Sequence, residues 1–223
     1  MDLDLMIVTF GALIFSALGG VFMQRNFQGS PVEKEDNVIV FQPKDPMLWI
    51  KLWNGATIVC SVAAAILLYF RGESTSVNLG VTMLLVTLCI CAWTDLSAGI
   101  IPNRVLGIAV LGRLALLGAE ALAAPDRVLD VVITCGAAGI ALLIAGLLCR
   151  LVSSGALGFG DVKLMVVMGM FLGMTYTWSA VFWSMVSIFV IALVLLLTKK
   201  AEKKSGVPFA PALLLGTVLG VLL

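Results

Sequence analysis

Long runs of apolar residues, separated by short polar stretches, dominate the pattern of this 223-residue chain. A helix needs about 20 apolar residues to cross a ~30 Å hydrocarbon core, and runs near that length recur along nearly the whole chain. They are continuous, unlike the alternating segments of about ten residues typical of a membrane β-barrel. The pattern predicts an all-α, polytopic membrane bundle of about eight transmembrane helices. The expected spans are 4–23, 53–70, 78–94, 103–122, 128–150, 162–176, 178–198 and 207–223.

One long polar stretch interrupts this pattern. Residues 24–52 contain Pro31, Pro43 and Pro46 together with several basic residues, and we expect a loop or small surface lobe there. The chain then divides into an N-terminal membrane region, residues 1–77, and a second membrane region, residues 78–223. Acidic rather than basic residues precede the first span, which is unlike a secretory signal peptide.

Composition supports the membrane class and excludes several functions. Hydrophobic residues make up 61% of the chain and the mean hydropathy is +1.12, more apolar surface than a soluble domain of this size could bury. A net charge of +1 gives no indication of nucleic-acid binding. The chain contains no histidine, which excludes Ser-His-Asp and Cys-His catalysis and the common histidine-based zinc sites.

The five cysteines are expected to be small buried residues rather than a redox or metal site. No CxxC pair occurs, and two of the cysteines are only two residues apart, so on a helix they point to different sides. All five lie within or at the ends of predicted spans: Cys60, Cys89, Cys91, Cys135 and Cys149.

Basic residues predict the orientation in the membrane. If residues 24–52 face the cytoplasm, eleven lysines and arginines lie on that side, Arg71 and Arg127 lie outside, and Arg113 falls within the fourth span. This positive-inside bias places both termini outside. The four lysines between residues 199 and 204 are expected to anchor the chain at the headgroups.

Two aspartates, Asp95 and Asp161, carry the candidate chemistry. Each lies at the edge of a long apolar segment in a chain that has only 12% charged residues. An ionisable group at membrane depth is by default a functional candidate. The third span runs inward and ends at Asp95, whereas the sixth begins at Asp161 and runs outward. The topology therefore brings both to the cytoplasmic face, where two carboxyl groups could share a proton.

The residues around the aspartates have structural and functional interpretations. Asp161 could simply cap a helix, and Asp95 could end a span among headgroups. Gly158 and Gly160 flank Phe159 and permit close approach of a peptide or a neighbouring helix, or form a flexible turn.

The other flanking residues are expected to support the site rather than to react. Pro102 and Asn103 are expected to start and cap the fourth span and to hold the loop after Asp95. Lys163 could hold a substrate carbonyl or extend to the interface.

These motifs indicate a protein family. The chain resembles the type IV prepilin peptidases, a GxGD class of intramembrane aspartyl proteases. The resemblance rests on residues 93–104, on Gly158-Phe159-Gly160-Asp161-Val162-Lys163, and on the late segment 207–212. It implies the GxGD aspartyl protease fold, with 78–223 as the catalytic membrane domain and Asp95 and Asp161 as the catalytic dyad.

The resemblance also implies the reaction and its place. The dyad would activate water, without a cofactor or metal, to cleave the leader of a prepilin or pseudopilin at the cytoplasmic face of the bacterial inner membrane. Cleavage would follow a glycine. Many bacterial members carry two CxxC pairs in the first cytoplasmic loop and also N-methylate the product. Residues 24–52 contain no cysteine or histidine, which excludes such a zinc site there and leaves methyltransferase activity open.

Other functions compete with this one. A proton- or ion-coupled transporter also uses intramembrane acids, but favours positions near the midplane and internal repeats. A scaffold that has lost catalysis is a second alternative. A serine–lysine protease using Ser153 or Ser154 with Lys163 has no supporting motif. The oligomeric state is not predicted; the partners expected are the prepilin substrate and membrane lipid, with no nucleic acid.

Overall fold

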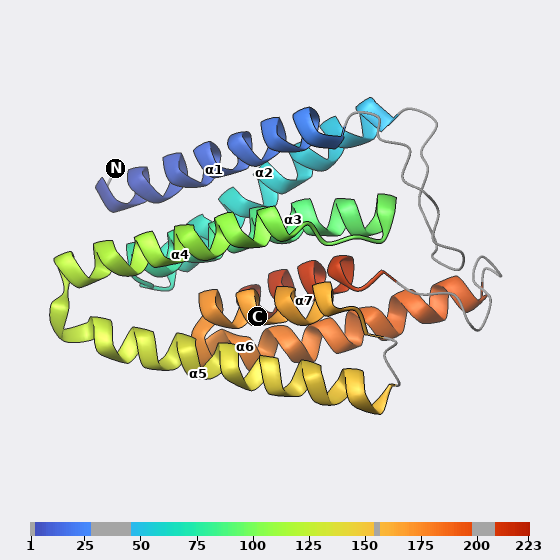
Figure 1. The fold of residues 1–223 in the computed structure, drawn as a ribbon. Helices are drawn as coiled ribbons and strands as arrows, with labels where there is room; N and C mark the ends of the chain where they lie inside the picture. The colour runs from blue at the N-terminus through green and yellow to red at the C-terminus, as the bar shows by residue number, and fades with distance from the viewer. Residues whose placement is uncertain (1–2, 28–45, 154–156, 198–207) are drawn as a thin grey trace.

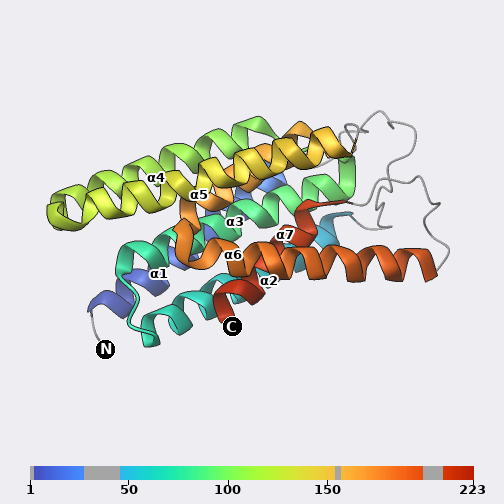
Figure 2. The ribbon, with the colours of Figure 1, turned by 90° about the horizontal axis from the view of Figure 1, so that it is seen from below.

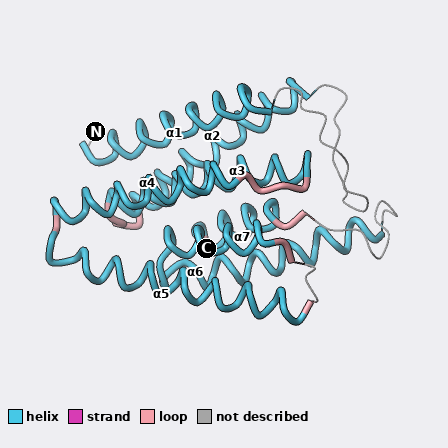
Figure 3. Tube along the Cα trace, viewed as in Figure 1, coloured by secondary structure: helices cyan, strands magenta, loops and turns pink. Residues whose placement is uncertain are grey.

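The described residues form seven helices. In this computed structural model they are residues 3–27, 46–153, 157–197 and 208–223, and none of them lies in a strand (Figure 1; Figure 3). The helices are α1 (Leu3–Phe27), α2 (Pro46–Phe70), α3 (Thr75–Ala98), α4 (Asn103–Ala123), α5 (Pro125–Val152), α6 (Phe159–Leu197) and α7 (Ala210–Leu222). The first six are long and apolar enough to cross a membrane. The all-α polytopic class is therefore confirmed.

Helix α3 is the centre of the bundle. In its most apolar window 72% of the residues are buried, against 28% or less in the other five long helices. Helices α1 and α2 pack on one side of it, and α6 and α7 on another (Figures 1 and 2). The outward surfaces of the surrounding helices are rich in exposed leucine, isoleucine and valine, as expected where lipid replaces water.

Helix α6 contains two segments that fold back on each other. The backbone leaves the helical conformation at Gly173, where φ is 58° and ψ is −170°, and the chain reverses direction there (Figure 2). Eight helical segments thus follow the predicted order, and the break between the sixth and seventh lies at Gly173, four residues before the predicted boundary at 177. The turn lies against Thr134 and Cys135, about three turns into α5. The first segment of α6, from Phe159 to Gly173, is only about four turns long.

A buried arginine occupies this turn. Arg113 of α4 is only 3% exposed, and its Nε donates a hydrogen bond to the Met170 carbonyl oxygen at 3.0 Å. A break in a helix leaves carbonyl groups of the preceding turn without their usual donors, and lipid cannot supply replacements. Arg113 Nη1 also lies 4.0 Å from Glu120 Oε2. These two contacts explain why Arg113, a cation at membrane depth to which the sequence alone gives no role, is present in the fourth span.

We expect Arg113→Met to destabilise the protein by about 1–3 kcal/mol, because it leaves buried acceptors without a donor. Thermal unfolding of the purified protein in detergent would show this as a lower Tm. Arg127→Met is the matched control, since Arg127 is exposed near the same end of the bundle. Equal Tm values for the two variants would contradict the role assigned to Arg113.

The polar stretch is shorter than predicted. Helix α1 continues to Phe27 and α2 begins at Pro46, so the ends of the predicted 24–52 loop are helical, and residues 28–45 lie outside the described part of the chain. Proline is suited to the first position of a helix, where its missing N–H would have no partner. Ile50, on the first turns of α2, is buried in the core.

Helix α7 packs very closely on the second segment of α6. A Cβ atom at Gly216 would lie 2.2 Å from the Ser184 backbone nitrogen, and one at Gly220 would lie 2.5 Å from the Ala180 nitrogen. Two glycines four residues apart let the helix backbones approach as in other small-residue membrane contacts. With 13 residues, α7 is shorter than the predicted span 207–223.

Candidate active site

Asp95 lies in the last turn of α3 and is nearly buried, with 8% of its surface exposed. The helix ends at Gly99, whose φ of 65° is the left-handed conformation common at helix C-termini and whose N–H donates to the Asp95 carbonyl. The side chain turns toward α7, where Oδ2 accepts a hydrogen bond from the Ala210 N–H at 2.9 Å. The first residue of α7 therefore holds this carboxylate.

Asp161 lies in the first turn of α6, two residues after Phe159 begins the helix. Its Oδ2 accepts a hydrogen bond from the Gly158 N–H at 3.2 Å. This is the reach-back of a capping box, in which the third helical residue binds the N–H of the cap, so the interpretation of Asp161 as the cap itself is wrong. A Cβ at Gly158 would lie 3.0 Å from this oxygen, which is a reason for glycine at that position.

The structure brings the two aspartates to the same end of the bundle, at the end of α3 and the start of α6. Their motifs also touch directly. A Cβ at Gly160 would lie 3.1 Å from Ile101 Cβ, so the loop after Asp95 packs on the glycine before Asp161. The two segments that carry the aspartates are therefore in contact, although they lie far apart in sequence.

A second contact links the same segments. Lys163 Nζ donates a hydrogen bond to Asn103 Oδ1 at 3.0 Å. Pro102 occupies the N-cap position of α4 without a side-chain hydrogen bond, and Asn103 is the first helical residue, so the prediction that Asn103 caps the helix is wrong. The physical reason is competition: its amide oxygen binds a lysine of α6 instead of the first backbone N–H groups.

Basic residues distribute as the charge pattern predicts. In the described part of the chain, those near the aspartate end are Arg25, Lys51, Arg104, Arg150 and Lys163, and those near the opposite end are Arg71 and Arg127. The lysines at 199–204 lie outside the described residues. Which end faces the cytoplasm stays a prediction.

The cysteines only partly fit their prediction. Cys89, Cys91 and Cys135 are buried, whereas Cys60 and Cys149 are exposed. Among the described residues, no group of three or more His, Cys, Asp or Glu side chains is placed to hold a metal ion.

One hydrogen-bond donor of the site could not be predicted from the types of the side chains. The donor to Asp95 is a backbone N–H, that of Ala210, from a segment 115 residues later in the chain. Its sequence signals are the two prolines, Pro208 and Pro211, and the segment 207–212, on which the family resemblance partly rests. Proline in the first turn of α7 marks a helix start, and a helix start presents unpaired N–H groups to an anion.

Fold and site together define the class: a polytopic helical membrane protein with two carboxyl groups, those of Asp95 and Asp161, at one end of its bundle. Comparison with known proteins gives the family. The profile of the type IV leader peptidase family matches residues 82–196, more than half of the chain, and the chain belongs to that family. The matched region includes both Asp95 and Asp161.

A curated relative agrees with this assignment. The chain is similar to the prepilin leader peptidase/N-methyltransferase of Bacillus subtilis (strain 168), with 32% identity over 135 residues. The match covers 60% of this chain and 52% of the relative, so the chain spans about half the length of that protein. No solved structure matches the chain.

Proposed function

We propose that this protein is a membrane aspartyl endopeptidase that removes the leader of type IV prepilins or pseudopilins. The observation that carries the proposal is the position of Asp95 and Asp161 at the same end of the bundle, on α3 and α6, where each carboxyl group accepts a hydrogen bond from a backbone N–H. Family membership supports a peptidase, and the relative's name supports a prepilin leader as substrate.

The pair supports a mechanism without a covalent intermediate. Two neighbouring carboxyl groups cannot both ionise at low cost, so one retains a proton. The ionised group takes a proton from a bound water, whose oxygen attacks the scissile carbonyl carbon. The protonated group donates a hydrogen bond to the carbonyl oxygen and stabilises the tetrahedral intermediate. The C–N bond then breaks, and the leaving amine takes the proton that the first carboxyl group accepted from the water, so that this group is ionised again.

The position of the pair supports the place of cleavage. Asp95 and Asp161 lie at an end of the bundle rather than near its middle, and the described basic residues gather at that end. By the positive-inside rule this end faces the cytoplasm of the bacterial inner membrane, with both termini outside. A substrate helix would be cut just beyond its apolar core. A transporter would instead favour acids near the midplane.

Cleavage of a candidate prepilin by the reconstituted protein tests the proposal. The substrate carries a short basic leader that ends in glycine, followed by an apolar helix, and mass spectrometry identifies the products. We expect one cut after the glycine and a mature helix that remains in the vesicle. No cut by the folded, reconstituted protein on any prepilin from its own genome would refute the proposed activity.

The contact between Ile101 and Gly160 gives a further prediction. We expect Gly160→Val to lower kcat/KM about 10- to 100-fold, because a displacement of about 1 Å at a catalytic group has effects of that size. Ile101→Gly in the same protein removes the Cβ that the new side chain would meet at 3.1 Å and should restore part of the activity. A double variant no better than Gly160→Val would contradict the contact as the cause.

A further inference from the structure

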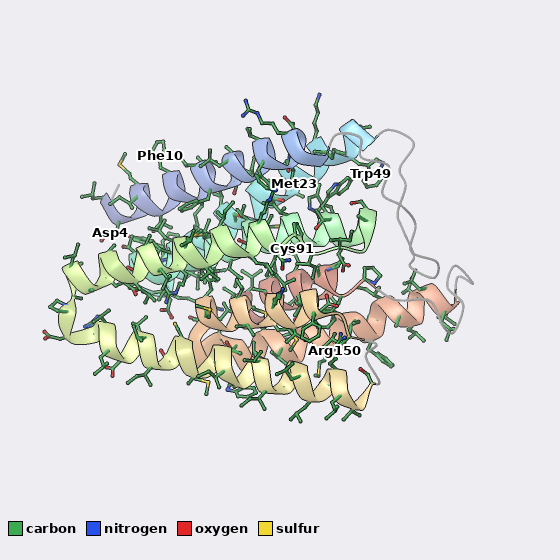
Figure 4. The ribbon with its side chains drawn as sticks, in the orientation of Figure 1. Asp4, Phe10, Met23, Trp49, Cys91 and Arg150 are labelled. Atoms are coloured by element: carbon green, nitrogen blue, oxygen red, sulfur yellow. The ribbon has the colours of Figure 1, made fainter. Side chains whose placement is uncertain are left out.

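Arg150, which the proposed mechanism does not use, contacts the segment that leads into Asp161. It lies in the last turn of α5, near the start of α6 (Figure 4). Its Nη1 donates a hydrogen bond to the Leu157 carbonyl oxygen. Its guanidinium carbon lies 4.2 Å from the centre of the Phe159 ring, within the range of a cation–π contact. The two contacts therefore lie on either side of Gly158.

The Leu157 carbonyl and the Gly158 N–H belong to the same peptide group. Arg150 binds the oxygen of this peptide, and Asp161 Oδ2 accepts its N–H at 3.2 Å. A cation on the carbonyl draws electron density from the peptide and makes its N–H a stronger donor, since linked hydrogen bonds polarise one another. One peptide thus connects the guanidinium to the carboxylate.

A purely structural role is the alternative. An arginine in the last turn of a helix interacts favourably with the helix dipole, and it could simply anchor the connection between α5 and α6. However, its hydrogen bond goes to Leu157 rather than to a carbonyl of α5. The side chain also stacks on the ring of the first residue of α6. Both contacts fix the peptide that binds Asp161.

We infer that Arg150 is a positioning residue for the dyad: it holds the Leu157–Gly158 peptide so that its N–H orients the Asp161 carboxylate toward Asp95. The inference rests on the proposed function for its effect on catalysis. Arg150 itself touches neither water nor substrate in this role. Its effect should therefore appear in turnover and in the titration of Asp161 rather than in substrate binding.

Kinetics of prepilin cleavage by Arg150→Ala and Arg150→Lys test the inference. We expect Arg150→Ala to lower kcat at least about tenfold with KM changed less than about twofold, because orientation of a reacting group affects kcat more than binding. Arg150→Lys keeps the cation and should recover part of kcat. Arg25→Ala is the matched control, because it removes an exposed arginine from the last turn of α1 at the same end.

Infrared spectroscopy of the reconstituted protein provides a readout that does not need a substrate. The band of the protonated Asp161 carboxyl is identified by its loss in Asp161→Asn. We expect this band to appear at a higher pH in Arg150→Ala than in the wild type, with Arg150→Lys closer to the wild type. A merely structural anchor would lower the Tm without moving the band.

The two readouts separate the inference from the proposed function. If the wild type cleaves no prepilin, the proposed function fails and the infrared titration alone decides the role of Arg150. An unmoved band in Arg150→Ala overturns the inference, whether or not cleavage is slower. A moved band with kcat within twofold of the wild type also overturns it, because the peptide link would then have no effect on the reaction.

Discussion

Replacing Asp95 or Asp161 by asparagine should reduce prepilin cleavage at least about 10³-fold, because in the proposed mechanism one carboxyl group takes a proton from the water and the other donates a hydrogen bond to the scissile carbonyl. Asparagine has nearly the same shape as aspartate and can still accept a hydrogen bond from the Ala210 or Gly158 N–H. Both variants should therefore insert in the membrane and keep their Tm. Product formation in proteoliposomes, followed by mass spectrometry, measures the effect.

The matched control for these variants is Asp126→Asn. Asp126 is exposed in the first turn of α5, near the opposite end of the bundle from the pair. It should cleave at the wild-type rate. If either Asp95→Asn or Asp161→Asn retains more than about a tenth of the wild-type rate, a shared-proton mechanism at this pair is wrong.

Displacing α7 should have an effect of similar size without touching an acidic residue. A valine at Gly216 would place its Cβ about 2 Å from Ser184, against backbone atoms that cannot rotate away. Helix α7 must then separate from α6, and the Ala210 N–H must leave Asp95. We expect Gly216→Val to lose cleavage almost completely and to lower the Tm, since overpacking alone costs about 1–3 kcal/mol or more.

Gly118→Val is the matched control for the α7 variant. Gly118 is also a helical glycine, but no atom lies within 4 Å of a Cβ built there. It should leave cleavage and Tm unchanged. An active Gly216→Val protein would mean that the hydrogen bond from α7 to Asp95 is dispensable for the reaction.

Most of the fold could be predicted because its cause is local. An apolar run must satisfy its backbone groups internally in lipid, so each run becomes a helix, and the number and order of runs give the topology. The turn near Gly173 was predicted, but its position was off by four residues, since the residues around it are as apolar as those of a full span. What permits a short segment there is Arg113, a donor from another helix, and that relation is absent from the local sequence.

The candidate site could be predicted where it consists of side chains of a distinctive type. Rare acids at the edges of apolar runs, together with alternating helix direction, indicate Asp95 and Asp161. The hydrogen-bond partners of the neighbouring residues could not be predicted, because several donors and acceptors compete for each side chain. Asn103 binds Lys163 instead of capping its helix, and Asp161 reaches back to Gly158 instead of preceding the helix. The Ala210 donor has no side-chain signature at all.

The bond between Asp95 and α7 also sets an order of events during biosynthesis. Asp95 leaves the ribosome 115 residues before the amide that holds it. Until α7 has been translated and has docked on α6, the carboxylate lacks this restraint. A nascent chain that already contains both aspartates therefore still lacks one of the hydrogen bonds that hold them.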